Sequence, residues 1–293
     1  MLTKRSLGEQ AFDMGNAILM VLISLITLYP LIYVLFSSLS DPHYVVQNRG
    51  LLLFPHGLNF DSYKMVFRNP NILTGFGNTF FYVTVGTGLN ILLTSLGAYA
   101  LSRKNLMLKN PIMFLIVFTM FFEGGLIPLY LLMRNLELLD TRFAVILPSA
   151  ISAFNLIIMR TAFQTVPESL EESARIDGAG DWTILFKIVI PLSMPVVAVM
   201  ILFYGVSHWN SWFLATIFLQ KREFFPLQVI LREILISNDT NAMSVGVGTS
   251  DQMAIGETIK YATIIIATVP ILFLYPFLQK YFVNGVMVGA IKE

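Results

Sequence analysis

Long apolar stretches alternate with polar segments along the whole chain. Six of the apolar stretches reach or exceed about 20 residues, the length that a transmembrane helix needs to cross a bilayer. They lie at about residues 17–37, 78–101, 111–133, 143–163, 192–219 and 259–282. The pattern therefore predicts an all-α integral membrane protein with six transmembrane helices, built as a single transmembrane domain over residues 1–293.

The first apolar stretch follows Lys4 and Arg5, as the apolar region of a secretory signal peptide follows its basic end. That region of a signal peptide is about 7–15 residues long. Residues 17–37 exceed this length, so we interpret them as an uncleaved first transmembrane helix.

The third apolar stretch is interrupted by Glu123, Gly124 and Gly125, and then by Pro128. Because proline has no backbone N–H, it removes the helical hydrogen bond to the residue four positions earlier, here Gly124. We expect a break or a kink at this point of the helix.

Composition supports a membrane protein and excludes several kinds of chemistry. Only 13% of the residues are charged and 56% are hydrophobic, whereas a soluble domain has about 25% charged residues. The chain has no cysteine, which excludes disulfides and cysteine-ligated metals. Its histidines, His43, His56 and His208, are far apart in the sequence, so we expect no metal site. The net charge of +1, without long basic runs, gives no indication of nucleic-acid binding.

Residues 165–191 form the longest stretch of mixed polarity between two apolar stretches. Thr165 and Glu168 have the spacing of a capping box, in which each side chain accepts a hydrogen bond from the other residue's backbone N–H. A short helix should follow, with an acidic side formed by Glu168, Glu171 and Glu172.

Gly178 fits the left-handed position that ends a helix. We expect Asp181 to cap a second short helix over residues 182–189, which Pro191 ends or kinks. The segment is therefore predicted to be a helix, a tight turn and a second helix, between two membrane spans.

The same segment resembles a known family. Glu172-Ser173-Ala174, then Gly178, then Ile188-x-Ile190-Pro191 matches the spacing of the EAA loop of ABC-importer permeases. Ser173 and Ile190 depart from the family's alanine and leucine with little change in size or polarity. The longer run EESARIDGA is similar to the sugar-importer branch of that family.

The resemblance implies that this loop is a coupling helix, which sits in a groove of a cytoplasmic ATPase subunit. The residues that it assigns to coupling are Glu172, Ser173, Ala174, Asp177, Gly178, Ala179, Ile188 and Pro191. The alternative, on the residues alone, is an amphipathic helix at the membrane interface without a docking partner.

The resemblance extends over nearly the whole chain, including the runs FFEGGLIPLYLLMRNLELLDTRFAVILP and YPFLQKYFVNGVMVGAIKE. These look like oligosaccharide permeases that depend on a binding protein, and an alginate-type importer of polysaccharide fragments is one candidate. The family works as a complex of two homologous permeases and two ATPase subunits, served by an extracytoplasmic sugar-binding protein. It transports by alternating access, and the long polar segments 38–77 and 220–258 would then face the binding protein.

ATP chemistry is not expected in this chain, because it lacks the G-x-x-x-x-G-K-[ST] motif that cradles nucleotide phosphates. The resemblance therefore leaves ATP and Mg²⁺ to the partner ATPase subunits, and this chain needs no cofactor of its own. A secondary, ion-coupled transporter is the main alternative, although such proteins usually carry more spans and more intramembrane charges. An intramembrane enzyme would need a nucleophile with a base, or paired aspartates, and neither pattern occurs.

Orientation is predicted from lysine and arginine residues near the span ends. The two sides carry nearly equal numbers, but the set that includes Lys4, Arg103 and Arg175 lies in shorter segments. This bias favours a protein of the bacterial cytoplasmic membrane with both termini and the coupling loop in the cytoplasm, as does the family resemblance.

A few polar residues inside the spans are candidates for the translocation pathway. We assign to it Glu123, Tyr130, Asn155, His208, Trp209 and Asn210. Aromatic rings beside an amide, as in the fifth span, suit a sugar, since rings stack on it and amides bond its hydroxyls.

Each of these assignments has a structural alternative. Glu123 is costly inside a bilayer and must face water or a partner, or be protonated; it serves either the pathway or a hydrogen bond across the glycine break. Trp209 fits an aromatic belt at the outer interface better. For Asn155 we favour a bridge between helices.

Overall fold

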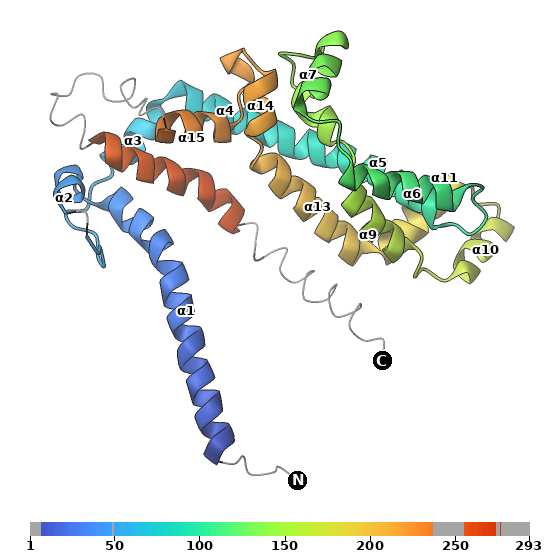
Figure 1. Cartoon of the computed structure of the whole chain (residues 1–293), viewed down its shortest axis with the longest axis horizontal. Coiled ribbons are helices and arrows are strands. Elements are labelled where there is room, and N and C mark those ends of the chain that lie inside the picture. The colour runs from blue at the N-terminus through green and yellow to red at the C-terminus, as the bar shows by residue number, and fades with distance from the viewer. Residues whose placement is uncertain (1–6, 49, 237–254, 274–275, 277–293) are drawn as a thin grey trace. The chain divides into compact units, whose positions relative to one another are not determined.

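The computed structural model describes residues 7–48, 50–236, 255–273 and 276, and these residues form helices and their connections without a strand (Figure 1). They divide into two compact units: residues 1–69 with 233–268, and residues 70–232 with 269–293. The element order is α1 (Leu7–Leu39), α2 (Pro42–Gln47), α3 (Asp61–Arg68), α4 (Pro70–Phe81), η1 (Tyr82–Gly86), α5 (Thr87–Ser102), α6 (Lys109–Phe121), α7 (Leu126–Asn135), α8 (Phe143–Ile146), η2 (Leu147–Ser149), α9 (Ala153–Phe163), α10 (Glu168–Ile176), α11 (Asp181–Ile184), η3 (Leu185–Val189), α12 (Ile190–Leu192), α13 (Met194–Trp209), α14 (Phe213–Phe218), η4 (Arg222–Phe224) and α15 (Leu227–Ile236), followed by the helix Ile255–Phe273.

Three helices in the described part of the chain are long and apolar enough to cross a membrane unbroken. They are Gly8–Leu39, Pro70–Ser102 and Ile255–Phe273. Three further pairs are bent: α6 with α7 by 111°, Phe143–Ser149 with α9 by 53°, and Asp181–Leu192 with α13 by 88°. Counting each bent pair as one span gives six, in agreement with the predicted all-α membrane fold.

The second span is longer than its apolar run indicates. It begins at Pro70, eight residues before the predicted Asn78, and α4 continues through the π-helical turn η1 into α5. A proline fits the first position of a helix, because the N–H that it lacks has no helical partner there. The first span also begins earlier, at Leu7, and the predicted end of the sixth, near residue 282, lies outside the described residues.

The break in the third span is confirmed, but Pro128 does not cause it. Helix α6 ends at Phe121 and α7 begins at Leu126, so Pro128 stands in the first turn of α7, where N–H groups lack helical partners. Gly125 has a φ of 82° and a ψ of 176°, a backbone conformation that glycine reaches without strain and other residues rarely adopt. The chain therefore turns at the glycine pair.

The fifth span also differs from its predicted limits of 192–219. Helix α13 covers Met194–Trp209, and the separate short helix α14 follows after residues 210–212. In the fourth, η2 and α9 are separated at residues 150–152, where Ser152 caps α9 by accepting from the Asn155 N–H.

The core of the larger unit forms where α5, α9 and α13 pack together (Figure 1). Met159, Phe163 and Met200 are fully buried there. In the other unit, the residues after α1 fold back on it: the Leu52 N–H donates to the Tyr29 hydroxyl, and Ser62 bonds Thr258.

Candidate coupling loop and solute cavity

The predicted capping box at the start of α10 is not formed. The Thr165 hydroxyl donates to the Ala162 carbonyl (2.8 Å), because Thr165 still belongs to the turn that ends α9. Pro167 occupies the N-cap position and has no side chain that could accept a hydrogen bond. Glu168 instead forms an exposed ion pair with Lys104 (2.9 Å).

The predicted turn at Gly178 is confirmed. Gly178 has a φ of 85°, and its N–H donates to the Arg175 carbonyl (3.0 Å). The Ala179 N–H donates to the Ala174 carbonyl (2.9 Å). These two bonds form a Schellman motif, which fixes the direction in which the chain leaves α10.

The second helix of the loop differs from its predicted form. Asp181 is its first residue and not its cap, and its carboxylate accepts from Arg175 (2.5 Å). The helix passes through the π-helical turn η3 and includes Pro191 in α12. The chain bends after Leu192, at Ser193, and α13 follows.

The loop packs one side onto the core and leaves the other exposed. Ile184, Leu185 and Val189 are buried, and Ala174, Ala179 and Ile188 pack against the same cluster. On the other side Glu172, Ser173, Asp177, Gly178 and Pro191 are exposed.

Large apolar side chains accompany these exposed positions. The exposed fraction is 86% for Ile176 and 66% for Trp182. The rings of Trp182 and Phe186 stack in parallel, with centroids 6.1 Å apart. An exposed surface of apolar and acidic side chains is what a protein partner would cover.

Glu171 does not belong to the exposed acidic side, so this prediction is wrong. It is 5% exposed and forms an ion pair with Arg103, which directly follows α5. Burial lowers the pKa of Arg103, and Tyr99 and Glu168 oppose this effect; arginine nevertheless remains charged in proteins. Sequence reasoning missed the pair because its members are 68 positions apart.

A polar cavity of about 160 Å³ lies beside the break between η2 and α9. Its walls are Ser149, Ile151, Ser152, Asn155, Phe203, Tyr204, Ser207 and His208. Asn155 is buried and is one of the residues that line this space. The volume admits a few waters or a hydroxylated group.

A hydrogen-bond network beside the cavity joins α5, α13 and the break between η2 and α9. Nδ2 of Asn90 donates to the carbonyls of Ser149 (2.5 Å) and Ala150 (2.8 Å), which the helix break leaves without helical partners. Nε2 of His208 donates to Oδ1 of Asn90 (2.6 Å). The Tyr204 hydroxyl accepts from the Ser152 N–H (3.1 Å) and bonds Thr94 (2.7 Å). Asn90, Thr94 and Tyr204 were not assigned to the pathway from the sequence.

The structure brings only two of the six predicted pathway residues together, Asn155 and His208. Glu123 is exposed in the α6–α7 break, and Asn210 is exposed at the end of α13. Tyr130 packs beside Phe218, with ring centroids 6.3 Å apart. Trp209 is 3% exposed, lies against Phe76 and Phe80, and lines a second cavity away from Asn155.

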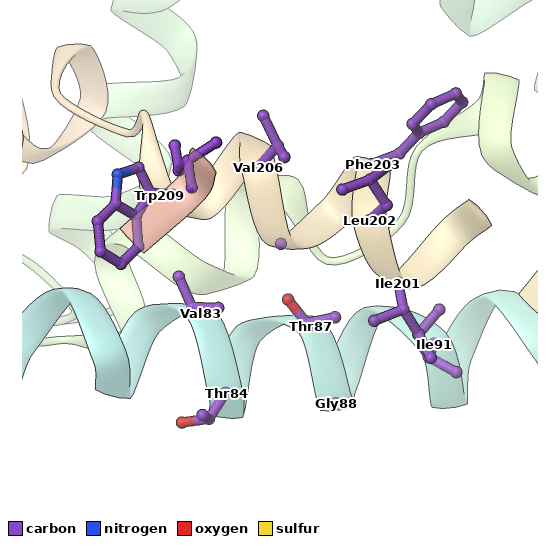
Figure 2. Close-up of a pocket in the computed structure, with 12 residues that line it drawn as sticks. Val83, Thr84, Thr87, Gly88, Ile91, Ile201, Leu202, Phe203, Val206 and Trp209 are labelled. Atoms are coloured by element: carbon purple, nitrogen blue, oxygen red, sulfur yellow. The ribbon is translucent and has the colours of Figure 1, made fainter. Parts of the chain in front are cut away.

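A second cavity, of about 950 Å³, lies between η1 and α5 on one side and α13 on the other. Figure 2 shows the Thr87 hydroxyl directed toward α13, whereas that of Thr84 points away. The Thr87 hydroxyl and Nε1 of Trp209 are buried without a hydrogen-bond partner among the described residues. Because its walls are otherwise mostly apolar, this cavity suits a hydroxylated solute less well than the polar one.

Metal coordination finds no support in the described residues, where no group of three His, Cys, Asp or Glu side chains is suitably placed.

Comparison with known proteins gives consistent matches over almost the whole chain. The model of the family described as "Binding-protein-dependent transport system inner membrane component" matches residues 11–288. The polygalacturonan/rhamnogalacturonan transport system permease protein YtcP of Bacillus subtilis is 42% identical over 289 residues, which cover 97% of this chain and 99% of that protein. The arabinooligosaccharides transport system permease protein AraQ of Halalkalibacterium halodurans is 29% identical, over 92% of this chain and 93% of AraQ.

A solved structure shares the fold. A chain in the crystal structure of a bacterial ABC transporter involved in the import of the acidic polysaccharide alginate matches with a TM-score of 0.87 and 36% identity. The match covers 95% of this chain and 99% of that one.

Proposed function

Because this chain belongs to the family of binding-protein-dependent transport system inner membrane components, we propose that it forms half of the membrane pathway for an oligosaccharide and couples that pathway to a cytoplasmic ATPase. Its relatives are permease subunits of ABC importers and not ATPases, and a secondary transporter is not supported. An importer of this kind includes ATPase subunits, a second permease and a binding protein in general.

The observation that carries the coupling proposal is the exposed side of the loop from α10 to α12. There the acidic Glu172 and Asp177 stand beside the apolar Ile176 and Trp182, while the opposite side is fixed to the core. We assign this side to docking on the ATPase subunit, which binds ATP and Mg²⁺. Movement of the docked loop would drive alternating access.

The proposed substrate is a fragment of an acidic polysaccharide. Support comes from the relatives, since one is named for polygalacturonan and rhamnogalacturonan and the matching structure for alginate. Within this chain we assign solute contact to the polar cavity. Asn155 and Ser207, which line the cavity, carry the amide and the hydroxyl that we assign to bonding sugar hydroxyls.

The segment between α1 and α4 is the proposed contact for the binding protein. It exposes a group of apolar side chains, which are Leu51, Leu53, Phe54, Leu58, Phe60 and Phe67. This assignment places the segment outside and both termini and the coupling loop in the cytoplasm. The second long segment assigned to this contact, 220–258, includes residues 237–254, which lie outside the described residues.

The substrate proposal is tested in proteoliposomes that contain this chain, its partner permease and its ATPase subunits, with the binding protein added. Labelled galacturonate oligosaccharides are the first probe, and alginate and arabinose oligosaccharides are the comparison. We expect uptake of an acidic probe that requires ATP. Uptake of the arabinose probe alone would refute the acidic substrate, and uptake without ATP would refute coupling to an ATPase.

Gly178→Asp tests the docking of the loop. An aspartate in the left-handed conformation strains the turn that follows α10, so we expect normal insertion into the membrane but loss of ATP-driven uptake. Gly180→Asp is the matched control, because Gly180 also has open space around an added Cβ but a φ of −77°. Normal uptake by Gly178→Asp would overturn the docking assignment.

A further inference from the structure

Arg103 connects three elements at one end of the larger unit. One guanidinium nitrogen forms the ion pair with Glu171 of α10. A second nitrogen, Nη2, donates to the Phe163 carbonyl at the end of α9 (3.1 Å). Arg103 itself is the cap residue of α5, and its guanidinium lies over the Tyr99 ring, 4.8 Å from the centroid. A single side chain thus joins the coupling loop to α5 and α9.

Burial distinguishes this ion pair from its neighbour. The side chains of Arg103 and Glu171 are 20% and 7% exposed, whereas those of Lys104 and Glu168 are 77% and 53% exposed. Breaking a buried pair leaves a charge without its partner and is strongly unfavourable. An exposed pair contributes little, because water and ions screen it.

The same α5 reaches the polar cavity. Asn90, which holds the carbonyls at the η2–α9 break, precedes Arg103 by 13 positions, or about 20 Å along a helix. A second contact supports this end of α5, since Nε of Arg160 donates to the Leu101 carbonyl (3.0 Å). Arg103, which contacts the coupling loop, therefore lies at the end of α5, and Asn90, which bonds the carbonyls beside the polar cavity, lies near its start.

We propose that the Arg103–Glu171 pair is the joint that passes movement of the coupling loop to α5 and so to the polar cavity, which makes Arg103 a positioning residue for transport. The pair prevents α10 from turning independently of α5 when the ATPase moves it. This inference rests on the proposed docking of the loop.

The test uses the reconstituted complex and compares two sets of variants. Arg103→Gln and Glu171→Gln remove the buried pair, and Lys104→Gln and Glu168→Gln remove the exposed pair in the same region. We expect the first set to lower galacturonate-oligosaccharide uptake per ATP hydrolysed by at least about fivefold, the lower end of typical coupling between sites. The double variant Arg103→Gln/Glu171→Gln should be no worse than either single change, since both remove one interaction. The second set should leave the ratio unchanged.

A distance between the turn after α5 and α10 tests whether the Arg103–Glu171 pair holds the two together, and it needs no sugar probe. The chain has no cysteine, so spin labels attach only where cysteine is introduced, here at Asn105 after α5 and Ser169 in α10. We expect a narrow distance distribution that is the same with and without ATP and vanadate, and a broader one in Arg103→Gln. If Arg103→Gln fails to assemble, Arg103→Lys is measured, because lysine keeps the charge but cannot bond Glu171 and Phe163 in the same planar arrangement.

Equal uptake per ATP in the Arg103 and Lys104 variants, or an unchanged label distribution in the assembled Arg103 variant, would overturn the proposal. Gly178→Asp separates this failure from that of the docking assignment. If Gly178→Asp uncouples transport and Arg103→Gln does not, docking stands and only the joint is wrong.

Discussion

Gly86 is the residue at which the polar network depends on the absence of a side chain. A Cβ added there would lie 2.5 Å from Nε2 of His208 and 2.7 Å from its Cε1. His208 is buried and held by Asn90, so it has little room to move away. Gly88, two positions later in the same span, has nothing within 4 Å of an added Cβ.

Gly86→Ala should therefore destabilise the protein, whereas Gly88→Ala should not. Overpacking a core costs about 1–3 kcal/mol, and loss of the His208–Asn90 bond adds about 1–3 kcal/mol for the buried groups left unpaired. At Gly88, alanine favours the helix by up to about 1 kcal/mol. Thermal unfolding of both variants in the same detergent measures the difference, and equal melting temperatures would contradict the close approach to His208.

Asp140, in the turn that follows α7, gives the stability of the larger unit a pH dependence. Its carboxylate accepts from the N–H groups of Lys221 (2.8 Å) and Gln220 (3.0 Å), and the Lys221 ammonium lies 3.6 Å away. The backbone hydrogen bond from Lys221 is the main reason that the pKa of Asp140 is lowered from 3.8. A carboxyl whose pKa is lower in the folded than in the unfolded protein stabilises the fold at a pH above its unfolded-state pKa. This contribution is lost as the pH falls through the folded-state pKa.

Asp140→Asn should therefore lower the melting temperature at pH 7 but matter less in acid. Asparagine keeps an oxygen that can accept a hydrogen bond, so the change isolates the charge. We expect the difference between wild type and variant to shrink progressively below about pH 4, since Asp has an ordinary pKa of about 3.9. A difference that stays constant from pH 7 to pH 3 would show that the charge of Asp140 does not stabilise this contact.

At the scale of the elements, the bend between α6 and α7 can be assigned either to Gly125 or to Pro128, and substitutions at the two positions distinguish them. Gly125→Ala should destabilise the break by about 1–3 kcal/mol, the cost of a side chain at a φ of 82° and a ψ of 176°. Pro128→Ala should change stability by less than about 1 kcal/mol, because the first helical turn does not need a proline. Thermal unfolding compares the two, and a larger effect of Pro128→Ala would assign the bend to the proline after all.

The sequence predicted correctly those features of the structure that depend only on residues close together in the chain. Apolar stretches predicted helices that make six spans when each bent pair is counted as one, and Gly178 located the turn after α10, because length and backbone conformation are local properties. The capping box failed because Thr165 still belonged to the previous turn. The Asn90 clamp and the Glu171 ion pair join residues about 60 positions apart or more, a relation that no local pattern contains.

At the scale of the whole molecule, orientation in the membrane connects the coupling loop with the proposed partners. In the proposed topology each bent pair is one span, so that six spans would bring both ends of the chain to one side, and the loop from α10 to α12, which follows the fourth span, would lie on that side too. The turn after α5 must share it, since Arg103 bonds Glu171. The same topology would put the segment between α1 and α4 on the opposite side of the membrane.

Single cysteines in this cysteine-free chain test that arrangement directly. Asn105→Cys and Thr183→Cys should react with an impermeant maleimide in inside-out vesicles, because both residues are exposed on the proposed cytoplasmic side. Leu58→Cys, 69% exposed in the wild type, should react in right-side-out vesicles. Binding of the ATPase subunits should protect Thr183→Cys, next to Trp182, and leave Asn105→Cys reactive if only the exposed side of the loop is docked. Reaction of Leu58→Cys and Thr183→Cys from the same side would exclude the six-span topology, whereas reaction of all three from reversed sides would keep the topology and overturn the orientation.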